Sequence, residues 1–448
     1  MRSIPNVALL GASAALLLLL VGIGAQSLRH WQNDAVVWVM LASAVVYVAA
    51  AWLVSRHEAQ RSAAAQKRVL WVILATAVLA RCVLVSSPPM STDVYRYVWD
   101  GRVQAAGINP YRYRPADSPV AFLRDTQVFP NINRADTAVT IYPPLAQMIF
   151  LSVTGVANSV LGMKAAMVGF ELLTMGVLLA LLRSRGLPGT RIIFYAWHPL
   201  PLFEFAGSGH IDAAAIALML SACLVAERKH PLSGGALLGG AALVKFFPIV
   251  IAPALYQRWG WRFPVALLAV VGVLYLPYLD VGWHALGFLP RYAEEEGLTT
   301  GQGFFMLSAL SRLLPLPDWA TAAYLILACV ILTCIAWAVV RRRNPAAVST
   351  NAALALLTVF TLLASPHLAW YFTWIIPFLC FRPSWALIYL SSTAPLLYGV
   401  VWTSDPLPLQ AALYVPFALI LVIEIWCNFR RSTSESSNDG RLGSRHAG

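Results

Sequence analysis

The sequence carries very little charge for its length. Only 12% of its 448 residues are Asp, Glu, Lys or Arg, whereas 59% are hydrophobic, and the mean hydropathy is +0.68. A soluble domain of this size needs far more charge to cover its surface. The composition therefore indicates a polytopic membrane protein. Because the apolar runs do not alternate as the strands of a barrel do, they predict an all-α fold.

The sequence also lacks the common cofactor and metal motifs. Its six cysteines lie within or at the ends of apolar runs, without metal-ligand spacing and without a disulfide framework. No glycine loop of the Walker or Rossmann type is present, and no HExxH zinc motif. We therefore expect neither a metal nor a cofactor. The net charge of +12 does not predict a nucleic-acid partner, because topology accounts for where the basic residues lie.

Apolar runs long enough to cross the bilayer recur along the whole chain. We expect about 12 to 14 membrane spans, with boundaries uncertain by about four residues. Two of the runs are short and contain or adjoin proline, which predicts half-helices. The candidate ranges are 7–25, 36–54, 69–85, 163–182, 191–206, 211–226, 232–247, 249–257, 263–279, 319–340, 350–364, 372–381, 384–401 and 408–427.

Placing the N-terminus in the cytoplasm puts most of the 32 lysines and arginines on that side, as the positive-inside rule requires. If residues 143–161 also spanned, the later basic loops would all move outside. We therefore expect that run to lie at the outer face or to be re-entrant. Residues 86–162 then form one long outer segment. The division into domains is 1–68 (two extra spans and a cytoplasmic loop), 69–428 (the main transmembrane domain) and 429–448 (a disordered cytoplasmic tail).

Five charged residues fall within the predicted spans, all near the level of the long outer segment: Arg81, Glu171, Glu204, Asp212 and Lys245. Charged side chains in a membrane are costly and usually functional. The alternative is pairing between helices, with either glutamate neutralising Arg81 or Lys245. A transport pathway would place charges near the midplane. Their common level instead favours a polar cavity that opens only outward.

The polar residues around this cavity suit displacement at a sugar carbon. Asp93 and Asp100 are candidate general bases, and cations suit a phosphate leaving group. The candidate phosphate-binding residues are Arg81, Arg96, Arg102, Lys245 and His367. The candidate substrate-binding residues are Tyr95, Asn109, Tyr111, Tyr142, Glu204, His210, Asp212 and Tyr371. As alternatives, the tyrosines form an interfacial belt, His210 caps a helix and His367 is a loop residue.

Five segments in this order resemble the GT-C superfamily of integral-membrane glycosyltransferases, and bacterial polyprenyl-phosphate-mannose-dependent mannosyltransferases of the family-87-like group in particular. A weaker likeness runs to the catalytic subunit of the eukaryotic GPI mannosyltransferase I. The resemblance covers roughly residues 70–380. The segments are STDVYRYVWDGRVQAAGINPY, TIYPPLAQ, HPLPLFEFAGSGHIDA, GGALLGGAALVKFFP and SPHLAWYF.

The resemblance implies a GT-C helical bundle whose first catalytic outer loop carries juxtamembrane helices. It also implies inverting transfer of a hexose, with mannose expected, from a polyprenyl phosphate to an extracytoplasmic glycan or glycolipid. The acidic residue of that loop acts as base, which corresponds to Asp93. This chain departs from the simplest pattern by having two spans before the one that leads into the loop, so Asp100 stays the alternative base.

Two rival functions use similar features. One is a transporter or flippase of a lipid-linked saccharide, and the other is an O-antigen-ligase-like polymerase. The inner halves of the predicted spans lack charged residues, Glu424 aside, which argues against a transporter. The expected location is the bacterial plasma membrane with the site facing outward. The sequence predicts neither the acceptor nor the oligomeric state.

Overall fold

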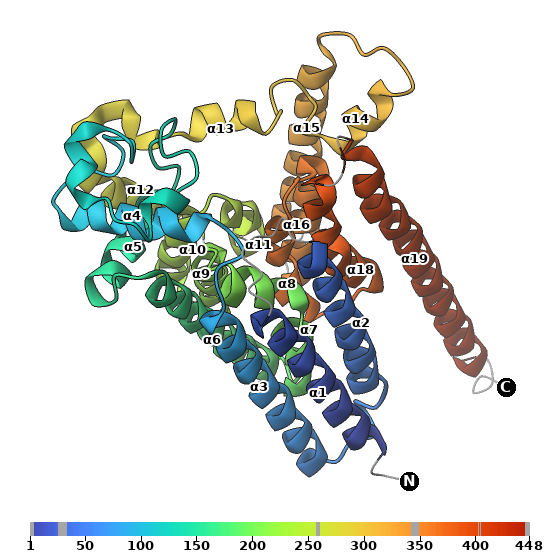
Figure 1. The fold of residues 1–448 in the computed structure, drawn as a ribbon. Helices are drawn as coiled ribbons and strands as arrows, with labels where there is room; N and C mark the ends of the chain where they lie inside the picture. The colour runs from blue at the N-terminus through green and yellow to red at the C-terminus, as the bar shows by residue number, and fades with distance from the viewer. Residues whose placement is uncertain are drawn as a thin grey trace.

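The protein is a helical membrane protein (Figure 1). The computed structural model describes residues 4–25, 34–256, 260–341, 349–401, 403 and 405–443, and every regular element within these ranges is a helix, which confirms the all-α prediction. In this described part, six helices are long and apolar enough to cross a membrane: Ala35–Arg56, Ala63–Ser86, Val160–Ser184, Arg262–Leu286, Ala320–Arg341 and Leu407–Arg430.

The N-terminal half is built on long helices. The helices α1 (Ile4–Ala25), α2 (Asp34–Arg56) and α3 (Ala63–Ser86) pack together, and α3 also contacts α6 (Val160–Ser184). Figure 1 shows the first turn of α1 and the last turn of α19 at the lower end of the bundle, and the segment between α3 and α6 at the upper end. This arrangement agrees with an even number of crossings.

The segment between α3 and α6 contains only short helices. They are α4 (Asp93–Ala105), the 3-10 turns η1 (Ser118–Leu123) and η2 (Phe129–Asn131), and α5 (Pro144–Val156). α4 and α5 pack closely at Gly101, where an added Cβ would lie 2.2 Å from Thr154 Oγ1. With 13 residues, α5 is about 20 Å long, shorter than the hydrocarbon core of about 30 Å. The structure thus agrees with juxtamembrane helices in this segment.

The predicted spans 191–206, 249–257 and 372–381 are among those that are not single helices. A proline lies inside each range, and proline removes a backbone donor and clashes with the preceding turn. Each range is therefore divided into short pieces. These are η3 (Gly189–Ile192), α7 (Ile193–Ala196), α8 (Pro199–Pro201), the π-helical turn η4 (Leu202–Gly207), η5 (Phe247–Ile251), α11 (Ala252–Tyr256), η7 (Ala369–Trp374) and α17 (Ile376–Leu379).

The remaining elements complete the bundle. α10 packs against both α9 and α12, and α18 packs against α19. In Figure 1, α13 lies between the long segment and the C-terminal helices. The bounds are α9 (Asp212–Glu227), α10 (Pro231–Val244), α12 (Arg262–Tyr275), η6 (Leu276–Leu286), α13 (Leu289–Glu295), α14 (Phe305–Ser311), α15 (Ala320–Arg341), α16 (Thr350–Ala364), α18 (Trp385–Thr393), η8 (Ala394–Val401) and α19 (Leu407–Gly443).

The predicted disordered tail, 429–448, is helical as far as the structure describes it. α19 continues through this region to Gly443. Residues 444–448 of the tail lie outside the described residues, as do 1–3 and 26–33 of the predicted N-terminal unit.

Candidate active site

A cavity of about 390 Å³ opens between the long segment and the C-terminal half of the chain. Its walls come from the start of α4, the loop before α5, the end of α10, α13 and the loop that leads into η7. The polar residues that line it include Asp93, Asn133, Tyr142, Lys245 and Tyr371. Apolar residues cover much of the rest, among them Phe246, Phe247, Phe288, Leu289 and Leu368.

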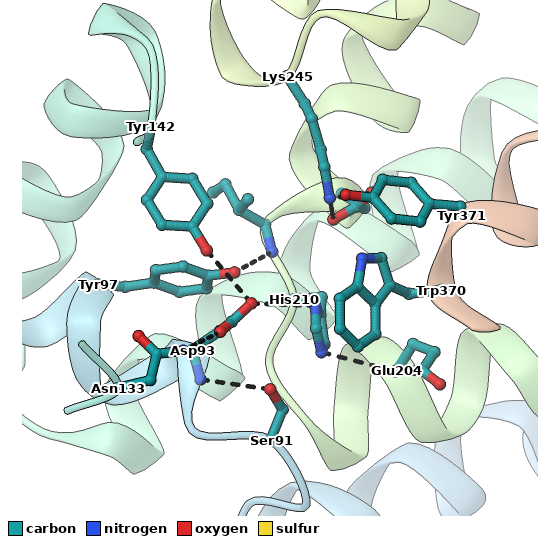
Figure 2. A network of polar contacts seen from close by, with 12 residues as sticks. Ser91, Asp93, Tyr97, Asn133, Tyr142, Glu204, His210, Lys245, Trp370 and Tyr371 are labelled. Carbon is teal, nitrogen blue, oxygen red and sulfur yellow. Dashed lines mark hydrogen bonds and ion pairs between the residues drawn. The ribbon is translucent and has the colours of Figure 1, made fainter. Parts of the chain in front are cut away.

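Asp93 is held in this cavity by donors from both sides (Figure 2). It is the first residue of α4, where the positive end of the helix favours a carboxylate. Asn133 Nδ2 donates to Oδ1 at 2.7 Å, and the Tyr142 hydroxyl donates to Oδ2 at 3.2 Å. Burial raises the pKa of Tyr142, so its hydroxyl keeps the proton that it donates. The Asp93 side chain is still 21% exposed, so it faces the cavity.

His210 lies behind Asp93 and is buried. Its Nδ1 is 3.9 Å from Asp93 Oδ2, and its Nε2 is 3.6 Å from Glu204 Oε2. The ring packs at 4.4 Å from the ring of Trp370. Gly209, at φ +81°, makes the tight turn that delivers His210, and a Cβ there would lie 3.1 Å from Val94. The unusual π-helical turn η4 carries Glu204 to the same place.

Lys245 is a fixed cation of the cavity wall. Its Nζ contacts both carboxylate oxygens of Asp212, at 2.9 and 2.7 Å, and lies 4.8 Å from the ring centre of Tyr371. Asp212 begins α9 and also accepts from the Trp374 indole at 3.1 Å. The Tyr371 hydroxyl meets that of Tyr292 at 3.0 Å. These contacts place a positive charge and aromatic surface opposite Asp93.

Residues 7–260, more than half of the chain, match the family model described as alpha-(1→6)-mannopyranosyltransferase, N-terminal domain. The chain belongs to this family. It is therefore a membrane α-1,6-mannosyltransferase, and the transferred hexose is mannose. No curated protein matches the chain, and no solved structure does either. The matched region carries Asp93, His210 and Lys245, whereas the wall with Tyr371 lies beyond it.

The mannosyltransferase brings eight of the predicted site residues together. Asp93, Tyr142, Lys245 and Tyr371 line the cavity, and Arg96 also reaches it. Glu204, His210 and Asp212 stand directly behind the lining, each within 4.0 Å of Asp93, Lys245 or one another.

Arg96 organises the cavity wall. Its guanidinium donates to the carbonyls of Asn133, Arg134 and Ala138, at 3.0 to 3.3 Å. Burial lowers its pKa. The side chain predicted to bind phosphate thus holds the loop that supplies Asn133 to Asp93.

Arg81 does not reach the cavity. It is fully buried and pairs with Glu171 at 2.6 Å, and its guanidinium also donates to the carbonyls of Ala77 and Ala196 at 3.0 Å. This is the helix-pairing alternative that the sequence left open. Arg102 is likewise engaged elsewhere, with Asn158 at 2.7 Å and Asp125 at 2.5 Å. The phosphate-binding prediction has no geometric support at either arginine.

Asp100 lies two turns further along α4 than Asp93 and is 1% exposed. It accepts from Gln147 at 3.1 Å, and burial raises the pKa of its carboxyl. Because it is not part of the cavity lining, the structure favours Asp93 over Asp100 as the base.

The remaining predicted site residues are not among the residues that line the cavity. Asn109 bonds the Tyr278 carbonyl at 3.3 Å, and the Tyr111 hydroxyl donates to the Tyr142 carbonyl at 2.6 Å. His367 Nε2 lies 3.0 Å from the Gly303 carbonyl oxygen. Tyr95 is half-buried on α4 and is not among the lining residues.

The sequence analysis did not identify Asn133 or Trp370 as site residues. Asn133 lies in an irregular loop, where no periodicity marks a functional side chain. Trp370 stands in the quoted segment SPHLAWYF, yet an aromatic residue near a membrane surface is commonplace. The polar run NINRAD was the one available signal for Asn133.

Proposed function

We propose that this enzyme takes mannose from a polyprenyl phosphate and transfers it, with inversion, to the 6-hydroxyl of a glycan or glycolipid acceptor. Asp93 is the general base. The reaction takes place on the outer face of the bacterial plasma membrane. The single observation that carries the proposal is the position of Asp93, ionisable and held by two donors, at a cavity that also presents Lys245.

A base is needed because the acceptor is an alcohol. A hydroxyl becomes an adequate nucleophile when a carboxylate takes its proton in the transition state. The contacts from Asn133 and Tyr142 fix the Asp93 carboxylate before substrate arrives, which lowers the reorganisation required during the reaction. The phosphate leaves as a stable anion and needs no general acid.

Lys245 and the apolar walls support a lipid phosphate as donor. The ammonium group stabilises the negative charge that grows on the departing phosphate. The phenylalanine and leucine side chains beside it suit an isoprenoid chain better than a nucleoside. Because the family forms an α linkage, inversion requires a β-linked donor.

The test compares Asp93→Asn with Asp100→Asn in purified enzyme. The assay supplies β-linked polyprenyl-phosphate mannose, its α anomer or GDP-mannose, with an α-1,6-linked mannobioside as acceptor. Asp93→Asn keeps the shape of the side chain but cannot accept a proton. We expect a loss of turnover of about a hundred- to ten-thousandfold, with donor binding retained.

Asp100→Asn is the matched control, because it is the same substitution on the same helix but outside the cavity lining. It should lose much less turnover. Asp93→Asn with more than about a tenth of wild-type turnover would show that another group is the base. Turnover with GDP-mannose or with the α-linked donor would contradict the proposed donor.

A further inference from the structure

A buried chain of titratable groups continues inward from Asp93 (Figure 2). Beyond Asp93 Oδ2 stands His210 Nδ1 at 3.9 Å, and on the far side of the ring Nε2 faces Glu204 Oε2 at 3.6 Å. The chain continues to Tyr398, whose hydroxyl donates to Glu204 Oε1. His210 and Glu204 are 1% and 2% exposed, so water does not replace the contacts between them.

Neither separation is a hydrogen bond, and Nε2 of His210 has no hydrogen-bond partner among the described residues. The tautomer of neutral His210 therefore depends on the charge of Glu204. An ionised Glu204 only accepts hydrogen bonds, and Tyr398 already donates to Oε1, so an N–H at Nε2 suits Oε2. Nδ1 is then a bare acceptor that faces the Asp93 carboxylate, which is also an acceptor until it takes a proton.

We propose that Glu204 is ionised in the working enzyme and holds His210 in this tautomer, and that His210 is a positioning residue that accepts a hydrogen bond from Asp93 once Asp93 has taken the acceptor's proton. This inference rests on the proposed function of Asp93. Trp370 packs against the imidazole ring, with the two ring centres 4.4 Å apart. Glu204 acts through His210 and does not touch the substrate cavity itself.

The proton balance of the step is simple. The acceptor's O–H bond breaks, its oxygen bonds to the mannose C1 atom, and the bond from C1 to the phosphate oxygen breaks with both electrons leaving on phosphate. The proton moves to Asp93 Oδ2, which then donates to His210 Nδ1. When the products leave, Asp93 releases the proton to water in the cavity.

His210 has other charged neighbours besides this pair. Asp93 comes from α4, Glu204 from η4, Asp212 from the start of α9 and Lys245 from the end of α10. Asp212 and Lys245 form an ion pair at 2.7 Å, so their opposite charges largely cancel and the pair has little effect on the electrostatic potential at His210. Variants of His210 and Glu204 therefore test the chain without disturbing the Lys245 cation.

Glu204→Gln is the main test, because the amide can donate to Nε2. Donation there moves the imidazole proton to Nδ1, which now donates to the Asp93 carboxylate and favours its ionised form. The pH at which kcat/KM rises should shift downward, since the base must be ionised to act. We expect kcat to fall on the order of ten- to a hundredfold, as when the partner that orients a functional histidine is removed.

His210→Phe keeps the ring against Trp370 but removes both nitrogens, and it should lower kcat to a similar degree. Because Glu204 acts only through His210, Glu204→Gln should cost little more in the His210→Phe background. Glu227→Gln is the matched control. It lies at the C-terminal end of α9, about 22 Å along the helix from Asp212, and should keep wild-type turnover.

The inference is overturned if Glu204→Gln keeps wild-type kcat and pH profile, or if its effect is unchanged in the His210→Phe background. Asp93→Asn is measured alongside. If Asp93→Asn stays active, the proposed base is wrong; if it is inactive while both other variants are normal, only the role of His210 is wrong. Should His210→Phe not fold, His210→Gln, which cannot bridge both carboxylates, gives the same comparison.

Discussion

Replacing Glu171 or Arg81 tests whether the buried Arg81 stabilises the fold or binds the phosphate of the donor. The two side chains are fully buried and 2.6 Å apart. Glu171→Gln keeps the shape of the side chain and one acceptor for Arg81, but removes the compensating charge. Breaking a buried ion pair by removing one partner costs about 3–5 kcal/mol. We expect Glu171→Gln near the lower end of that range.

Arg81→Met should cost more, near the upper end of about 3–5 kcal/mol. It removes the donors of the Ala77 and Ala196 carbonyls as well as the partner of Glu171. The double variant Arg81→Met with Glu171→Leu leaves no unpaired charge and should recover most of the loss. Arg81 Nε and Glu171 Oε2 have no hydrogen-bond partner among the described residues, which favours this recovery.

The assay is unfolding of the purified variants in mixed micelles by titration with dodecyl sulfate, combined with donor KM on the folded fraction. If Arg81 and Glu171 stabilise the fold as a pair, each single variant should lower the free energy of unfolding. The loss in the double variant should then be much smaller than the sum of the single losses, and the donor KM should be unchanged. If the single variants instead keep the free energy of unfolding and lose donor affinity, the pair belongs to the phosphate site and this reasoning fails.

Two further predictions concern the donor and the topology. Lys245→Met should raise the donor KM by about tenfold or more, since a charge-assisted contact is worth about 1.5–3 kcal/mol, and should leave the acceptor KM unchanged; an unchanged donor KM contradicts phosphate binding. Reporter fusions at Gln60, Ser184 and Ser434 should all be cytoplasmic and a fusion at Asp117 should be outside; an outside signal at Ser184 would mean that α5 belongs to a span.

Composition and loop length predicted the coarse fold well. Low charge and recurring apolar runs indicated a helical membrane protein, and the distribution of basic residues argued that 143–161 does not cross. The structure has the corresponding helix, α5, too short to span. The helix ends were harder to predict, because a proline inside an apolar run leaves its hydropathy almost unchanged while it interrupts the hydrogen bonds of the helix.

The sequence predicted the level of the buried charges but not the direction in which each one points. Helices such as α3 and α6 are apolar around most of their circumference, so no amphipathic pattern reveals which face meets which neighbour. Arg81 was therefore a candidate for phosphate binding, with pairing to a glutamate as the alternative, until the packing of α3 on α6 was known. Asn133 depends on loop geometry, which Arg96 holds through three carbonyls.

Glu171, Asp212 and Glu204 are all buried carboxylates, yet they differ in role because their partners differ. Glu171 meets a buried arginine and so holds α3 to α6. Asp212 meets a lysine that is still 18% exposed, so it fixes a cation at the cavity wall before any substrate arrives. Such preorganisation is what stabilises charge that develops in a transition state. Glu204 faces His210 instead of a cation, and His210 in turn faces the proposed base, Asp93. Under the proposal above, the charge of Glu204 therefore determines which ring nitrogen of His210 carries the proton.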